Sequence, residues 1–306
     1  MTDQHTTTGP AAQSVPSRRA PDARHLRRPS DDPTLNDGSR TPTTPAWAPT
    51  PTLTDRRVLH APALVVAEAP AEKDSPGARV AAVLERLGRP VAVVPPGTVG
   101  APAGAEGLAV HPLVVHVGSA EAIGQADAVR RTVAAFGPGT TITYDAAAGA
   151  GTTGDAREVV EELVARADVV RVATRDLDAL YPGEEHRDAV GRWLRAGPSI
   201  VVVSGGAAGA WAVNAVGVTA TSTTAVAADD DADAAFMAGV IDALWKGGLL
   251  GGIGRPDLRT LVQGSLRELV DHGSAAAALT ASGGTVSREE LMRARGVPRI
   301  EARRTT

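Results

Sequence analysis

The sequence contains no cysteine and few aromatic residues, and both absences narrow its chemistry. Among 306 residues there are two phenylalanines, two tyrosines and four tryptophans. The absence of cysteine excludes disulfide bonds, thiolate metal sites and thiol catalysis. Because aromatic residues are so few, the core must be built from alanine, valine and leucine. Each of these side chains buries little area, so helices have to pack closely on a sheet.

The chain also lacks long apolar runs and a large net charge. No segment approaches the roughly eighteen apolar residues of a membrane span, and the N-terminal residues have no apolar stretch typical of a secretory signal. The formal net charge of −4 does not favour a nucleic-acid binder. We therefore expect a cytoplasmic protein with no membrane or nucleic-acid partner.

Composition divides the chain into two tails and one domain. Residues 1–57 are rich in proline, threonine and arginine and have no apolar periodicity, so we expect them to be disordered. We expect a single α/β domain over residues 58–296 and a second disordered tail over residues 297–306.

Within that domain, short valine-rich runs alternate with helical patterns. The runs that predict strands are 63–67, 90–95, 113–117, 140–144, 168–172 and 200–204. The segments that predict helices are 77–87, 120–136, 155–166, 185–196, 231–246, 256–271 and 287–294. The strands lack regular polar alternation, so both of their faces should be buried. The alternation predicts an α/β fold with a parallel sheet layered by helices, whose ligands bind beyond the carboxyl ends of the strands.

Two glycine-rich segments follow predicted strands. Gly149-Ala-Gly151-Thr-Thr-Gly154 matches the dinucleotide pattern GxGxxG. It starts late after its strand, and Asp168 begins the next strand where a ribose-binding acid should end it, so a flexible loop is the favoured interpretation. Ser204-Gly-Gly206-Ala-Ala-Gly209 follows its strand directly, and its glycines suit either a ligand or a tight turn.

An acidic cluster opens the helix predicted at 231–246. Its members are Asp229, Asp230, Asp231 and Asp233. Acids in a first helical turn complement the helix dipole, which explains them without a ligand. Their alternation is also loosely typical of a calcium loop, but Ala234 and Val240 stand where such a loop has glycine and glutamate. The rest of the helix has one apolar stripe, formed by Phe236, Met237, Val240, Ile241 and Leu244.

Seven segments follow one another in an order that points to a family. They are residues 78–94, Val115-His-Val-Gly-Ser119, Asp145, residues 167–183, Ser204–Gly209, residues 235–244 and residues 275–282. In this order they resemble the ribokinase-like (PfkB) carbohydrate kinases, in particular the fructokinase-like members. The resemblance implies a three-layer α/β/α sandwich with a mostly parallel central sheet and a small β lid. It also implies transfer of a phosphoryl group from ATP, with Mg²⁺, to a sugar hydroxyl.

The resemblance also assigns roles to residues. It implies nucleotide binding by Ser204, Gly206, Gly209, Ala278 and Ser282. It places Arg79 and Asp145 at sugar-side positions. The family's D-T-x-G-A-G-D motif presents backbone amides to the migrating phosphate, and its last aspartate is the base.

Departures from this motif predict impaired catalysis. Ala234 stands at the position of the base, and Asp231 and Asp233 replace two glycines. Unpaired carboxylates at this helix start would oppose the charge of phosphoryl transfer, each by ~1–4 kcal/mol. Loss of the base costs roughly a further 10²–10⁴-fold in rate. Arg79 replaces the asparagine that would bond the sugar, and the chain between Val94 and His116 is too short for lid strands.

We therefore predict a degenerate, lid-less sugar-kinase homologue, a pseudoenzyme that binds a sugar, an adenine nucleotide or a partner. The alternatives are an active kinase in which Asp233 is a displaced base and a metal bridges Asp231 and Asp233, a dinucleotide-binding protein that uses Gly149–Gly154, and a relic without a ligand. The lid strands often make the family's dimer contact, so their absence favours a monomer or a weak dimer.

Overall fold

The computed structural model describes residues 63–66, 75–97, 112–118, 125–136, 138–147, 154–205, 209–221 and 229–295. All of them belong to a compact unit that spans Thr54–Thr306. The two predicted tails lie outside the described residues, as do residues 98–111 of the segment between Val94 and His116 and residues 149–153 of the first glycine-rich segment.

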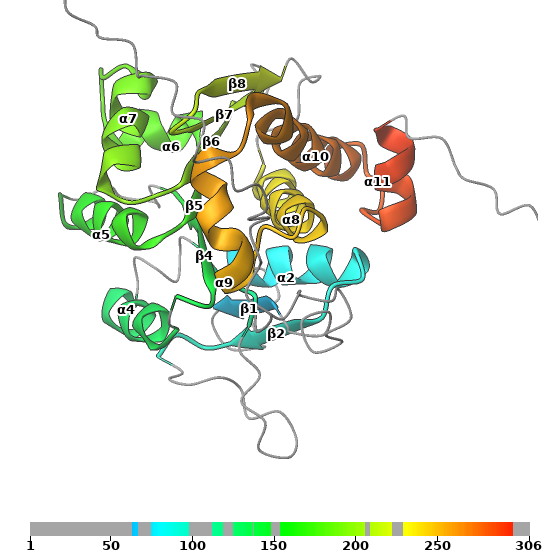
Figure 1. The fold of residues 1–306 in the computed structure, drawn as a ribbon, viewed down its shortest axis with the longest axis horizontal. Helices are drawn as coiled ribbons and strands as arrows, with labels where there is room; N and C mark the ends of the chain where they lie inside the picture. The colour runs from blue at the N-terminus through cyan, green and yellow to red at the C-terminus, as the bar shows by residue number, and fades with distance from the viewer. Residues whose placement is uncertain are drawn as a thin grey trace, which may run out of the picture. The chain divides into compact units, whose positions relative to one another are not determined.

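The described strands form a single eight-stranded sheet in the order β2-β1-β3-β4-β5-β6-β7-β8 (Figure 1). The strands are β1 (Ala63–Val66), β2 (Val91–Val94), β3 (Val114–Val117), β4 (Thr141–Ala146), β5 (Val169–Ala173), β6 (Ile200–Ser204), β7 (Ala210–Asn214) and β8 (Val218–Thr221). Pairs from β2 to β6 are parallel, and β7 and β8 add to β6 in antiparallel fashion. The predicted mostly parallel sheet is confirmed, with two further strands that we did not predict.

Helices cover both faces of this sheet, so the predicted three layers are confirmed (Figure 1). The helices are α2 (Pro76–Arg86), α4 (Ala126–Ala135), α5 (Gly154–Arg166), α6 (Thr174–Leu180), α7 (His186–Ala196), α8 (Asp230–Lys246), α9 (Gly251–Gly254), the 3₁₀ helix η2 (Arg255–Thr260), α10 (Gln263–Ala281) and α11 (Arg288–Ala294). One apolar core lies between the sheet and α2, α8 and α10, and a second lies between the sheet and α4, α5 and α7.

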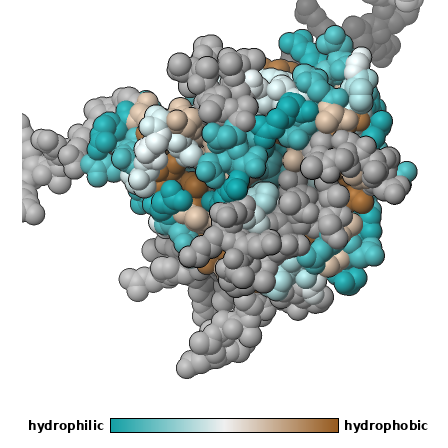
Figure 2. Space-filling view, turned by 180° about the vertical axis from the view of Figure 1, so that it is seen from behind, coloured by the Kyte–Doolittle hydropathy of each residue, from teal (hydrophilic) through white to brown (hydrophobic). Residues whose placement is uncertain are grey.

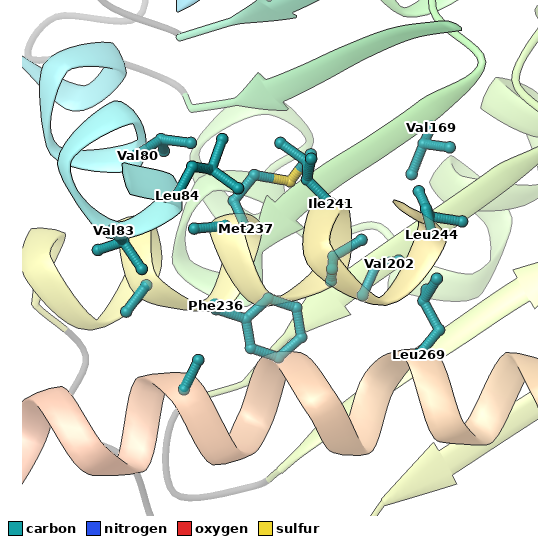
Figure 3. Close-up of a cluster of buried hydrophobic side chains, with 14 of the residues drawn as sticks. Val80, Val83, Leu84, Val169, Val202, Phe236, Met237, Ile241, Leu244 and Leu269 are labelled. Atoms are coloured by element: carbon teal, nitrogen blue, oxygen red, sulfur yellow. The ribbon is translucent and has the colours of Figure 1, made fainter. Parts of the chain in front are cut away.

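Helix α8 is the centre of the first core, between the sheet, α2 and α10 (Figure 3). Phe236, Met237 and Ile241 are buried, but so are the neighbouring residues Ala235 and Ala238. The single stripe predicted from the sequence is therefore too narrow, because α8 is packed on several sides. A helix in this position needs small residues where its neighbours approach closely.

The segment predicted as one helix at 256–271 is two elements. Leu261 and Val262 have extended ψ angles of 124° and 155°, which separate η2 from α10. Helix α10 then continues beyond the predicted end at residue 271, through the alanine-rich residues 275–281. Alanine has the highest helix propensity, so a single long helix is favoured there.

No single described helix has both the length and the apolar composition of a membrane span; α8 and the following Gly251–Thr260 meet that test only jointly, with an 83° bend between them. On the face shown in Figure 2, the hydrophobic residues form small, separate areas among hydrophilic ones. Scattered apolar residues of this kind are ordinary on a protein surface.

Candidate functional site

Three buried polar side chains meet at the carboxyl ends of the central strands. Asp145 on β4 is paired in register with Arg171 on β5, and Ser204 ends β6. Arg171 donates one hydrogen bond to the Asp145 carboxylate at 2.9 Å and another to the Ser204 hydroxyl oxygen at 2.6 Å. The parallel register therefore gathers these groups at the edge where α/β proteins bind ligands.

Residues of the first turn of α8 complete this cluster. The Asp229 side chain caps the helix by accepting a hydrogen bond from the Ala232 amide at 2.7 Å. One oxygen of Asp233 forms an ion pair with Arg171, and the other accepts a hydrogen bond from Arg175 at 2.5 Å. The side chains of Asp233 and Arg171 are 14% and 2% exposed, so their ion pair lies largely out of water, whereas Arg175 is 44% exposed and its pair with Asp233 borders on solvent.

The more exposed aspartates of α8 also pair with arginines. Arg79 on α2 lies 3.3 Å from a carboxylate oxygen of Asp230 and 3.3 Å from one of Asp231. Arg175 lies 3.6 Å from Asp230. The premise that these carboxylates are unpaired is therefore wrong, because arginines from β5, α6 and α2 neutralise part of their charge.

The cluster nevertheless keeps an acidic excess. Arg79, Arg171 and Arg175 face five aspartates in the described part of this edge, namely Asp145, Asp176, Asp230, Asp231 and Asp233. A phosphate group would have to compete with carboxylates that already hold the guanidinium groups. The repulsion between these aspartates and a phosphate group is weaker than it would be if the aspartates were unpaired, but the net interaction is still repulsive.

Burial and neighbouring charges shift the pKa values of the two innermost charged groups, Asp145 and Arg171. Burial raises the pKa of Asp145 to about 6; Arg171 opposes this shift, and the negative charges of Asp233 and Asp176 add to it. Burial alone would lower the pKa of Arg171, but Asp145 and Asp233 outweigh it and raise that pKa. Arg171 is therefore a permanent cation, whereas Asp145 exchanges its proton near neutral pH.

His116 lies on β3 at the same face of the sheet. Its Nδ1 is 3.1 Å from the Thr143 hydroxyl oxygen, and that hydroxyl can donate onward to the Val115 carbonyl at 3.4 Å. Burial lowers the pKa of His116 to about 3, so the ring is neutral. Among the described atoms its Nε2 has no hydrogen-bond partner.

The structure brings together some of the predicted site residues. Asp145, Ser204, Asp233, Arg79 and Asp231 belong to the cluster described above. Ala234 is 3% exposed and packs in the first core. Gly209 has a positive φ of 84° and its carbonyl accepts a hydrogen bond from the Gly205 amide, whereas Gly206 lies outside the described residues.

Ala278 and Ser282, to which the resemblance assigns nucleotide binding, are distant in sequence from this cluster. They nevertheless lie toward the same end of α8. Asp242 of α8 bonds His272 of α10, whereas Gly239 lies against Gly273 and Ala276. The two helices therefore run antiparallel, so Ala278 and Ser282 lie along the half of α10 that is beside the start of α8. Ala278 is half-buried, and the exposed Ser282 caps α10.

The acidic cluster does not fit the predicted metal bridge. Asp231 and Asp233 are held by different arginines. Among the described residues, no three or more His, Cys, Asp or Glu side chains are grouped so that they could hold a metal ion. A metal ion that bridges Asp231 and Asp233 would therefore have to displace these arginine contacts.

The position of Asp168, the candidate ribose-binding acid, does not support the dinucleotide alternative. Asp168 lies at the amino end of β5, where it accepts hydrogen bonds from the Ile142 amide at 2.8 Å and from Arg255 at 2.7 Å. That edge is opposite the carboxyl ends, where a ribose would lie. Gly149 and Gly151 lie outside the described residues, and Gly154 begins α5.

Sequence reasoning missed Arg171 and Arg175, which organise the cluster. A signal was present, because Val169-Val-Arg171-Val places one charge inside a run of buried valines. A buried guanidinium requires a carboxylate partner, and the sequence does not say which aspartate supplies it.

Comparison with known proteins agrees with the geometry at the level of the fold. No family model matches the sequence, and no curated protein matches it significantly. Solved structures of sugar kinases do match. Fructokinase from Xylella fastidiosa with bound ATP superimposes with a TM-score of 0.55 at 14% identity, over 72% of this chain and 90% of that chain.

Two further kinases give the same result. Fructokinase from Vibrio cholerae, bound to fructose, ADP and calcium, has a TM-score of 0.53 at 16% identity, covering 76% of this chain and 96% of that one. Aminoimidazole riboside kinase from Salmonella enterica, complexed with aminoimidazole riboside and an ATP analogue, has a TM-score of 0.51 at 16% identity, covering 76% and 97%. The chain has the ribokinase-like fold. The ribokinase-like expectation is thus confirmed for the architecture, and activity has to be argued from residues.

Proposed function

We propose that this ribokinase-like chain is a carbohydrate-kinase homologue with impaired phosphotransfer, a pseudoenzyme that acts by binding a sugar, an adenine nucleotide or a partner. The fold supports the ligand class, because fructokinases of this fold are seen with fructose, ADP and ATP. ATP and Mg²⁺ are the cofactors that this proposal implies.

The observation that carries the proposal is the state of the first turn of α8. Ala234 offers a buried methyl group where the resemblance places the base. The neighbouring carboxylate, Asp233, has one oxygen paired with Arg171 and the other with Arg175. A carboxylate whose two oxygens are both held by guanidinium groups is poorly placed to accept a proton from a sugar hydroxyl.

The same turn supports binding without turnover. Phosphoryl transfer depends on positive groups that stabilise negative charge as it moves to the transferred oxygens. In this cluster the arginines are already paired with internal carboxylates, so the stabilisation available to a transferring phosphate is small. Gly209, with its positive φ, keeps the turn after β6 that the resemblance assigns to the nucleotide.

An ADP-release assay with a panel of sugars and ATP–Mg²⁺ tests turnover, and thermal shift with ATP–Mg²⁺, sugars and NADH tests binding. We expect a stability gain with a sugar or with ATP–Mg²⁺ and no ADP release above background. Ligand at 100 times its dissociation constant should stabilise the fold by about 2.7 kcal/mol. A gain with NADH alone would favour the dinucleotide alternative, and the absence of any gain would contradict binding.

One observation favours the second candidate, an active kinase with Asp233 as the base. Asp233 is the α8 aspartate that reaches the buried cluster, whereas the side chains of Asp230 and Asp231 are about 70% exposed. If this candidate holds, ADP release is measurable in the unaltered chain and Asp233→Asn abolishes it. Asp231→Asn is the matched control and should leave that turnover within a few-fold.

A further inference from the structure

A second buried charged group lies on α8, away from the site at the carboxyl ends of the strands. The Asp242 carboxylate is 1% exposed and lies 2.7 Å from Arg89, 2.7 Å from Lys246 and 2.8 Å from the Nε2 atom of His272. Burial alone would raise the pKa of Asp242, but His272, Lys246 and Arg89 outweigh it and lower that pKa. Asp242 is therefore a fixed anion that joins α8 to α10 and to the turn between α2 and β2.

His272 connects this anion to the end of α11. The Nδ1 atom of the ring lies 3.0 Å from a guanidinium nitrogen of Arg295, the residue that caps α11. A guanidinium group only donates hydrogen bonds, so Nδ1 must be the acceptor. The ring proton is then on Nε2, which donates to Asp242. Both ring nitrogens are used, and the arrangement requires a neutral imidazole.

We propose that His272 and Arg295 form a proton-sensitive clasp, which holds the C-terminal end of α11 against the α8–α10 pair and opens when His272 takes up a second proton. A proton on Nδ1 removes the acceptor and sets an N–H of a cation against the Arg295 guanidinium. The hydrogen bond is lost and is replaced by repulsion. Arg295 is exposed, so its side chain can turn into water.

The charges around His272 set the direction of this response. Asp242 and Lys246 face the ring from α8, Arg89 reaches it through Asp242, and Arg295 faces it from the end of α11. Burial lowers the pKa of His272, Lys246 and Arg295 add to this shift, and Asp242 opposes it. The clasp is therefore closed at neutral pH and opens in acid.

Helix α11 is the element that would respond. It has seven residues, and Leu291 is its buried side chain. Ser287 caps its first turn by accepting a hydrogen bond from the Glu290 amide at 3.2 Å. Its start is thus fixed by the cap and its middle by Leu291, while its end depends on Arg295, so opening the clasp should loosen the last turn.

The test compares the full chain with its Arg295→Met variant, which keeps bulk and removes the donor. Arg293→Met is the matched control, because Arg293 lies in the same turn and pairs with Glu289 at 3.2 Å. Imidazole ¹⁵N shifts report the tautomer and titration of His272. Hydrogen exchange, corrected for intrinsic rates, reports the protection of α11 from pH 5 to pH 8.

We expect the Nε2–H tautomer at pH 7 and a loss of α11 protection in acid of about tenfold, which matches one hydrogen bond to a charged group. In Arg295→Met this loss should already be present at pH 7, and the pKa of His272 should rise toward its ordinary range. Arg293→Met should behave as the unaltered chain. An Nδ1–H tautomer at pH 7, or equal α11 protection in the unaltered chain and Arg295→Met across the pH range, would overturn the clasp.

Discussion

Asp145 and Arg171 show how single buried charges set the pH response of the fold. Burial gives Asp145 a pKa of about 6 in the folded chain, above the usual value of 3.8 for an aspartate. The folded state therefore holds this proton more tightly than the unfolded state. The resulting stabilisation is full below about pH 4 and is lost as the pH rises through about 6.

Asp145→Asn should remove the loss of stability that accompanies the ionisation of Asp145 above about pH 6, because an amide oxygen can still accept the hydrogen bond from Arg171 without carrying a charge. We expect the variant to be more stable than the unaltered chain at pH 8, by about 1–3 kcal/mol, and equally stable near pH 4. Urea unfolding at several pH values measures both. Asp257→Asn, at an exposed aspartate of η2, should show no such trend. Lower stability of Asp145→Asn at pH 8 would mean that the ion pair with Arg171 outweighs the burial of Asp145.

At the scale of elements, the crossing of α8 and α10 depends on two facing glycines. A Cβ atom on Gly239 would lie 2.9 Å from the Gly273 Cα and 3.0 Å from the His272 carbonyl oxygen. Both contacts are with backbone, which cannot move without separating the helices. Gly239→Ala should therefore destabilise the fold by about 1–3 kcal/mol, although alanine is the better helix former.

Gly191 in α7 is the matched control for this prediction. A Cβ atom there would meet only the flexible end of Arg195, at 3.6 Å. Gly191→Ala should therefore stabilise the fold by roughly 0.5–1 kcal/mol through helix propensity alone. Thermal or urea unfolding of the two variants decides the matter, since equal effects would show that the α8–α10 crossing tolerates a wider spacing.

The elements also show where the sequence was informative. The first six strands were predictable because buried parallel strands are continuous apolar runs. β7 and β8 were not, because β8 alternates exposed and buried residues over only four positions and is joined to β7 by a short turn that Asn214 holds. The aspartates of the site were readable as a cluster, but their arginine partners come from three other elements and meet only in the folded chain.

At the scale of the whole molecule, the arginines at the carboxyl edge of the sheet are already paired with the chain's own carboxylates. Ion pairs joining α8 to β5, α6 and α2 hold them in this state. Such pairs reduce the field at the helix start without reversing it. The binding of a nucleotide at this edge should therefore be limited by charge, so its affinity should depend on the acidic residues of α8 and on salt.

The paired variant Asp231→Asn with Asp233→Asn tests this limit, because it keeps side-chain size and removes two negative charges next to Arg79, Arg171 and Arg175. We expect the affinity for ATP–Mg²⁺, measured by calorimetry, to rise roughly tenfold at low salt, as expected for about 1–2 kcal/mol of relieved repulsion. The gain should shrink at high salt, because mobile ions screen exposed charges. Asp257→Asn with Asp271→Asn changes the net charge equally in η2 and α10 and should leave the affinity unchanged. An equal gain in both pairs would assign the effect to net charge, and no gain in either would mean that the nucleotide does not approach the start of α8.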